Sequence, residues 1–314
     1  MANDHDLLLP FPTDRPLGYL EFASWEYPER WYKRAEAQGD VPVAAGERVR
    51  LVLRSPTPLE SLAVLLPAYE AGLEELELQF SDVTTSAMEE LPSLTRLTHL
   101  SLGYRQTDER TLSIIGAMPW LLGLRLESST VTDASFLRLH RLTGLTELSL
   151  RGTAITDASM PHIGTLTRLR ILDLGGTPIT DKGMKHLDAL TDLWDLDVAE
   201  TGVGDGWTST LRTFARLEWL SLWDAAVTDA LLPTIGRLAN LVVLNLGDTM
   251  VTDDGLRHLA RLHSIEDLTL YGTSVTRTGI NALQDALPNC DIGWEDAAED
   301  TAGENVWPPR HSMP

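Results

Sequence analysis

Residues 145–157 read Leu-Thr-Glu-Leu-Ser-Leu-Arg-Gly-Thr-Ala-Ile-Thr-Asp, and the pattern of this stretch returns every 24 residues along most of the chain. Counting its first residue as position one, position four is Leu in nine consecutive units, and position six is Leu or Val. No insertion interrupts the series of first positions, which is Leu73, Leu97, Leu121, Leu145, Leu169, Leu193, Leu217, Leu241 and Ile265. A fixed period of this length is typical of repeat architectures.

The spacing within one unit predicts its local structure. Positions four and six alternate as in a strand, whereas the apolar positions sixteen, nineteen and twenty-two suit a short helix or 3₁₀ turn. A turn rich in Thr and Asp joins them, as at 152–157 and 176–181. Its Thr-Asp pair can cap the helix, and the Thr at position nine is expected to bond turn backbone. Because one unit cannot bury its own leucines, we expect an α/β solenoid with a parallel sheet on one face.

The pattern L-x-x-L-x-L-x-x-T-x-[VI]-T-D resembles the leucine-rich repeat over about residues 73–294. Its T-D-x-G-[LM] continuation, at 180–184 and 252–256, is similar to the cysteine-type repeats of F-box substrate receptors and of bacterial effectors. Here Thr stands where that subtype often has Cys. The resemblance implies a curved solenoid, with the parallel sheet on the concave face and short helices on the convex face. It also implies that the concave sheet binds other macromolecules.

The repeat array divides the chain into four predicted parts. Residues 1–48 form an N-terminal aromatic-rich cap, 49–72 a degenerate capping repeat, 73–294 the nine repeats with a terminal strand, and 295–314 an acidic flexible tail. The cap covers the open apolar end of the array, as solenoids require, or alternatively serves as a docking element. No F-box pattern is found in it. The cap's aromatic residues are Tyr19, Phe22, Trp25, Tyr27, Trp31 and Tyr32.

Composition narrows the partners and the compartment. The chain has 25 Lys and Arg against 46 Asp and Glu, a formal net charge of -21, which repels phosphate and argues against nucleic acid and anionic membranes. The single Cys290 excludes an internal disulfide and a Cys-based zinc cluster. Without a basic leader or an apolar span of about 20 residues, a cytoplasmic location is expected, with a secreted effector as the alternative. Only three lysines occur, which we interpret as a high-GC bacterial origin.

Aromatic side chains gather in units six to nine. Positions two, three, five, seven and eight flank the buried leucines and should face the concave side. Large aromatics dominate binding hot spots, so we predict that this group anchors a partner. In the alternative, these side chains pack on each other or lie under the cap or tail. The predicted anchors, with two aliphatic neighbours, are Trp194, Trp219, Trp223, Tyr271, Ile171 and Val243.

Acidic side chains lie beside the aromatic ones, namely Asp173, Asp195, Asp197, Glu200, Asp224 and Asp248. Asp173 and Asp197 share a column in adjacent units, about 4.8 Å apart, and repel each other unless a cation or a partner's Arg or Lys lies between them. The group predicts a site for a basic partner, with a metal pocket or a plain solvated acidic face as the alternatives. Lateral ion pairs between units are expected of Arg125, Glu127, Glu147, Arg151 and Arg170.

The functional prediction is a non-catalytic module that binds a basic protein on its concave face. The sequence contains no H-E-x-x-H, G-x-S-x-G or Walker-type motif, so no enzyme activity, cofactor or metal is expected. One rival is a substrate-receptor or effector adaptor that recruits a second protein through residues 1–48. The other is a carbohydrate-binding protein or glycosidase that uses the Trp and Asp patch. The sequence names neither the partner nor the oligomeric state.

Overall fold

The computed structural model describes residues 7–14, 16–24, 31–44, 47–54, 58–79, 81–103 and 107–295. These fall into two compact units, which divide between Thr130 and Val131. The predictions for Trp25, Tyr27 and the tail after residue 295 lie outside the described residues, as do the side chains of Trp31 and Tyr32.

The second unit is a parallel sheet whose strands follow one another in chain order, each bonded to the next. They are β9 (Glu147–Ser149), β10 (Ile171–Asp173), β11 (Asp195–Asp197), β12 (Trp219–Ser221), β13 (Val243–Asn245), β14 (Asp267–Thr269) and β15 (Asp291–Gly293). The register pairs equal repeat positions, such as Leu172 with Leu196. Residues that are 24 positions apart in the sequence are therefore paired in neighbouring strands. The α/β solenoid predicted from this period is confirmed.

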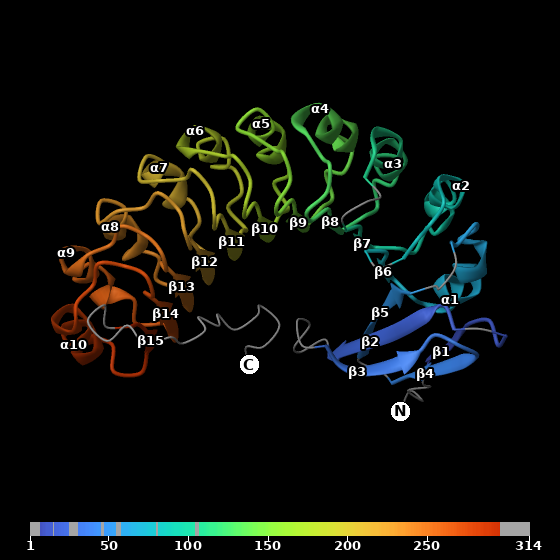
Figure 1. Ribbon diagram of the computed structural model, residues 1–314, viewed down its shortest axis with the longest axis horizontal. Helices are drawn as coiled ribbons and strands as arrows, with labels where there is room; N and C mark the ends of the chain where they lie inside the picture. The colour runs from blue at the N-terminus through green and yellow to red at the C-terminus, as the bar shows by residue number, and fades with distance from the viewer. Residues whose placement is uncertain are drawn as a thin grey trace. The chain divides into compact units, whose positions relative to one another are not determined.

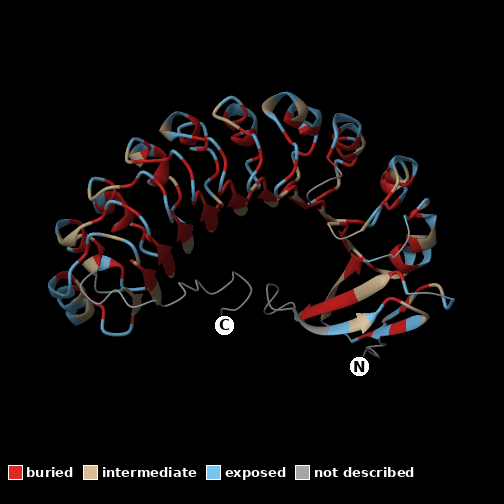
Figure 2. Cartoon of the chain, viewed as in Figure 1, coloured by how far each residue is buried: buried red, intermediate tan, exposed pale blue. Residues whose placement is uncertain are grey.

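Short helices lie on the other side of each repeat, so that within this unit the strands line the inner side of the curve and the helices its outer side (Figure 1). The helices are α4 (Asp133–Phe136), η3 (Leu137–Leu139), α5 (Met160–Ile163), α6 (Asp181–Met184), α7 (Thr208–Leu211), α8 (Leu232–Ile235), α9 (Asp253–Leu256), η4 (Leu259–Arg261) and α10 (Arg277–Ala286). The buried residues run between these two layers (Figure 2).

Threonine at position nine closes the turn in five repeats. The Thr153 hydroxyl donates to the Leu150 carbonyl at 2.6 Å, and Thr177 and Thr249 repeat this bond three residues back at 2.5 and 2.6 Å. Because these threonines are buried, the bond satisfies a carbonyl that stacking has removed from water. The predicted role of this position is confirmed.

A second ladder of hydrogen bonds links neighbouring repeats through position thirteen. Asp157 accepts from the Thr180 backbone N–H at 2.8 Å and from its hydroxyl at 2.6 Å. Three repeats further on, Asp229 does the same for Thr252. Glycine follows in the T-D-x-G motif because a Cβ at Gly183 would lie 2.4 Å from the Asp157 carboxylate. The Thr and Gly of the motif are thus the residues that contact the Asp of the preceding repeat.

The sixth repeat departs from the pattern by one residue. Position sixteen is the polar Thr208, but its neighbour Trp207 is fully buried and supplies the missing apolar volume. The Trp207 indole donates to the Gly204 carbonyl at 3.0 Å and packs on Phe214, with ring centroids 6.4 Å apart. A buried indole with its N–H satisfied keeps the core continuous.

The first unit combines antiparallel and parallel pairing. Strand β2 (Gly18–Ser24) lies between β3 (Trp31–Glu36) and β5 (Glu47–Leu53), both antiparallel to it. From β5 onward the pairing is parallel, through β6 (Glu75–Glu77), β7 (His99–Ser101) and β8 (Gly123–Arg125). Strands β1 (Leu7–Pro10) and β4 (Asp40–Val43) form a separate pair. Its helices are η1 (Ala63–Leu65), α1 (Leu66–Ala71), α2 (Thr85–Met88), η2 (Leu91–Ser93) and α3 (Glu109–Ile115).

The sheet of the first unit has one apolar and one charged face. Leu20, Phe22 and Leu51 are fully buried on one side, where parallel strand β6 continues the face with Leu76. Strands β2 and β3 thus form an antiparallel edge next to β5, a feature that the repeat period could not reveal. No helix in the described ranges is both long and apolar enough to cross a lipid bilayer.

Candidate functional site

Trp223 is the most exposed aromatic among the predicted anchors, with 37% of its surface accessible. It follows β12 at position seven, and its ring lies against Gly247, where a Cβ would come within 2.8 Å of the indole. The indole N–H donates to an Asp248 carboxylate oxygen at 2.6 Å. The ring is therefore held in one orientation before any partner arrives, which lowers the entropic cost of binding.

The other predicted anchors come from several neighbouring repeats: Ile171 begins β10, Trp194 precedes β11, Trp219 begins β12 and Tyr271 follows β14. Trp194, Trp219, Tyr271 and Ile171 are half-buried. Val243 differs, because only 5% of it is accessible and it pairs directly with Trp219 of the neighbouring strand. Val243 thus belongs to the floor of this surface. We call Trp194, Trp219, Trp223, Tyr271 and Ile171 the aromatic surface.

Three of the predicted acids are buried, and two of them accept hydrogen bonds from the backbone. Asp173 accepts from the Gly175 backbone N–H at 3.0 Å, and Asp197 accepts from that of Ala199 at 2.9 Å. Asn245 makes the same bond to Gly247 at 3.0 Å, so position five closes the strand end in several repeats. Asp195 is 7% accessible on β11. These side chains shape the sheet face and expose little charge to a partner.

Arg151 lies among these acids. Its guanidinium passes over Gly175, approaches Asp197 at 3.3 Å and Asp173 at 3.9 Å, and also pairs with Glu200. The sequence argument required a cation or a partner's basic residue between Asp173 and Asp197, but the chain itself supplies Arg151, one repeat before Asp173 and two repeats before Asp197. The lateral ion pair expected of Arg151 is confirmed, whereas an empty metal pocket or open acidic pair at Asp173 is not what the structure shows.

The remaining predicted acids are exposed and share an uncommon backbone conformation. Glu200, Asp224 and Asp248 have φ of 58°, 51° and 53°. The same position eight is glycine, also with positive φ, at Gly152 and Gly272. A non-glycine residue in this left-handed region costs about 1 kcal/mol. Three successive repeats thus retain an exposed carboxylate where glycine would be the easier residue.

Glycines in the position-seven column leave room for large side chains of the preceding repeat. Arg151 lies over Gly175, Trp223 over Gly247, and Gln79 in the first unit over Gly103. Ala199 and Gly247 on either side of Trp223 in this column already indicate room for a flat ring from the sequence, whereas the reach of Arg151 over Gly175 was not predicted. Within the described residues, no three His, Cys, Asp or Glu side chains gather where they could hold a metal ion.

A protein-family model described as "Leucine Rich repeat" matches residues 165–187. This segment, which contains β10 and α6, is thus similar to a leucine-rich repeat. No curated protein matches it at significant sequence similarity.

Solved leucine-rich-repeat structures support the same fold. An internalin of Listeria monocytogenes, inlF, aligns with a TM-score of 0.57 and 19% identity, covering 81% of this chain and 74% of that chain. Internalin C2 of the same organism aligns with a TM-score of 0.53 and 23% identity, covering 65% of this chain and 84% of that one. At these identities the likeness concerns the fold.

Proposed function

We propose that this leucine-rich-repeat protein is a non-catalytic module that binds a basic protein on the strand-lined face of its second unit. The observation that carries the proposal is Trp223, an exposed indole fixed in place by Asp248 and Gly247. Fixed aromatic side chains supply large contact areas at low entropic cost, and they dominate interface hot spots.

Charge supports a basic partner. Glu200, Asp224 and Asp248 are exposed beside the aromatic surface, in a chain of formal net charge -21. Non-glycine residues kept in left-handed conformations gather at functional sites, because their cost is otherwise removed by glycine. Complementary charge speeds association and excludes acidic competitors. Raised salt is therefore expected to slow association more than it speeds dissociation.

The test compares Trp223→Ala with Met250→Ala. Met250 is also an exposed apolar residue of the second unit, 58% accessible, but it lies outside the strand positions. Proteins captured by the wild-type chain from a native lysate are identified, purified and measured by surface plasmon resonance. Loss of a hot-spot residue costs about 2 kcal/mol, or roughly 30-fold in Kd, whereas Met250→Ala stays within about twofold. Equal Kd values for Trp223→Ala and wild type contradict the site assignment.

A further inference from the structure

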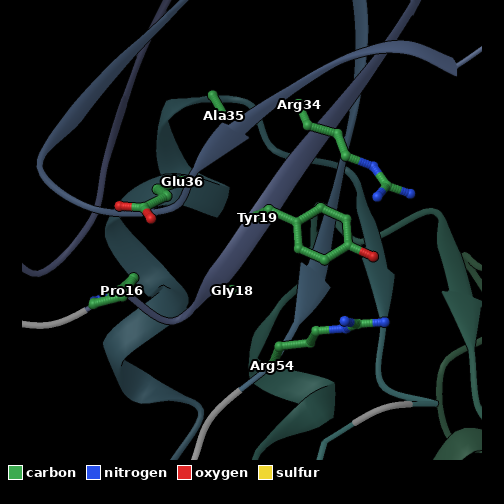
Figure 3. Close-up of a pocket in the computed structure, with 7 residues that line it drawn as sticks. All are labelled: Pro16, Gly18, Tyr19, Arg34, Ala35, Glu36 and Arg54. Atoms are coloured by element: carbon green, nitrogen blue, oxygen red, sulfur yellow. The ribbon is translucent and has the colours of Figure 1, made fainter.

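The first unit contains a small open pocket of about 380 Å³ at the end of its antiparallel strands. Tyr19 forms its centre, with Arg34 and Arg54 on either side and Glu36 at the other end (Figure 3). Its volume falls within the range of small-ligand sites. The pocket belongs wholly to this unit and is separate from the aromatic surface.

The strand register explains why these residues meet. Tyr19 on β2 pairs with Glu36 on β3 and with Val52 on β5. Arg34 and Arg54 are each two residues from those partners, so their long side chains reach Tyr19 diagonally from opposite sides. Their guanidinium carbons lie 4.8 and 5.5 Å from the ring centroid. Two guanidinium groups therefore lie near the same Tyr19 ring, and Figure 3 shows both near its hydroxyl end.

A buried carboxylate orients Arg34. Glu21 is 4% accessible and accepts from Arg34 Nε at 2.9 Å, while its other oxygen accepts from Arg50 Nε at 2.8 Å. A guanidinium has five N–H donors, and the Glu21 contact uses the Nε and Nη2 side of Arg34. Arg34 therefore keeps donors for a second anion, in a position fixed from within the sheet.

We propose that this pocket binds a carboxylate group, held between the Arg34 and Arg54 guanidinium groups and the Tyr19 hydroxyl. A carboxylate accepts charge-assisted hydrogen bonds from guanidinium donors, and the donors that Arg34 keeps are directed by its contact with Glu21. The flat Tyr19 ring and the small residues Gly18 and Ala35 leave an apolar wall beside the charge.

Glu36 favours a ligand with a single negative charge over one with two. Its carboxylate lines the same pocket, so a dianion such as phosphate meets more repulsion than a monoanion does. The net negative charge of the whole chain acts in the same direction. A monocarboxylate with an apolar body is the class of ligand that fits, either as a free small molecule or as the C-terminus of a peptide.

The experiment titrates the whole chain by calorimetry, with four probes. Sodium benzoate represents the small molecule, and a tripeptide with a free or an amidated C-terminus represents the peptide source. Inorganic phosphate tests the charge preference. Two or three charge-assisted hydrogen bonds predict a Kd on the order of 1 mM for benzoate. Binding of benzoate alone assigns the site to small molecules, and binding of only the free-carboxylate tripeptide assigns it to peptide termini.

Variants locate the binding. Arg34→Gln and Arg54→Gln are each expected to weaken binding about tenfold, and Glu36→Gln to strengthen it about threefold. Tyr19→Phe keeps the ring between the guanidinium groups and removes only the hydroxyl, so it tests the site even if Arg34→Gln loosens the sheet. Arg237→Gln, at an exposed arginine of the second unit, is the matched control.

Three results would overturn the proposal. They are the absence of heat with benzoate and with both tripeptides up to about 50 mM, unchanged Kd values in Arg54→Gln and Tyr19→Phe, or tighter binding of phosphate than of either carboxylate probe. None of these results bears on the binding of a protein to the aromatic surface.

Discussion

Replacing Arg151 by Met removes the charge that the structure places among three carboxylates while keeping most of the side-chain length. Arg151 lies 3.3 Å from Asp197 and 3.9 Å from Asp173, and these two acids are 6% and 5% accessible. An ion pair at about 4 Å is worth about 4 kcal/mol at an effective dielectric constant of about 20. Because the Arg151 side chain is 35% exposed, solvent reduces this value. We expect the free energy of unfolding to fall by about 2 kcal/mol.

Urea unfolding followed by circular dichroism measures this loss. The matched control is Arg216→Met, because Arg216 pairs with Asp192 at 2.9 Å but both side chains are largely exposed, at 67% and 46%. An exposed pair of this kind contributes less than about 1 kcal/mol. High salt is expected to narrow the difference between Arg151→Met and wild type, since salt screens the repulsion between Asp173 and Asp197.

A second substitution makes the reasoning refutable. Asp197→Asn keeps the bond to the Ala199 N–H, as Asn245 shows for Gly247 in the same column, but removes one of the two opposed charges. We therefore expect Arg151→Met to cost about 1 kcal/mol less in the Asp197→Asn background than alone. If the two losses simply add, Arg151 does not neutralise the acidic column, and this explanation of the surface fails.

Two further substitutions test packing and titration. Gly183→Ala places a Cβ against the Asp157 carboxylate and Met160, so it should lower the free energy of unfolding by about 2 kcal/mol, and by less in an Asp157→Ala background; equal losses in both backgrounds would refute the contact. Burial and the facing Asp291 raise the pKa of Asp267. The ionised Asp267 therefore destabilises the fold above its folded pKa. Asp267→Asn should add about 0.5 kcal/mol at neutral pH, and this gain should shrink as the pH falls through the folded pKa and disappear toward about pH 3, below the ordinary pKa of Asp, where the carboxyl is protonated in both states. Denaturant melts at several pH values measure it, and a gain that does not change with pH would contradict it.

The 24-residue period of the sequence predicted most of the strand pairing and turn structure of the second unit. Apolar columns predicted which residues pair across strands, and Thr153 shows that even a turn hydrogen bond follows from position in the repeat. These predictions succeed because each contact joins equal positions in neighbouring units. A contact of that kind is set by local spacing alone.

The sequence was less informative where side chains reach across columns. Arg151 contacts acids in the next two repeats, which depends on its length and on the absence of a Cβ at Gly175. The burial of Val243 depends likewise on the neighbouring Trp219. In the first unit, the antiparallel strand β2 has no counterpart in the repeat and could not be read from the period.

The glycines that follow Arg151 and Trp223 in the position-seven column limit how the array can be lengthened. Trp223 occupies space that Gly247 leaves empty, and Arg151 occupies the space at Gly175. A tandem copy of the repeat that carries Trp223 would set a second indole against the first, with no vacancy to receive it. Lengthening this protein by gene duplication, or by design, therefore requires copying a bulky repeat together with its glycine-bearing successor.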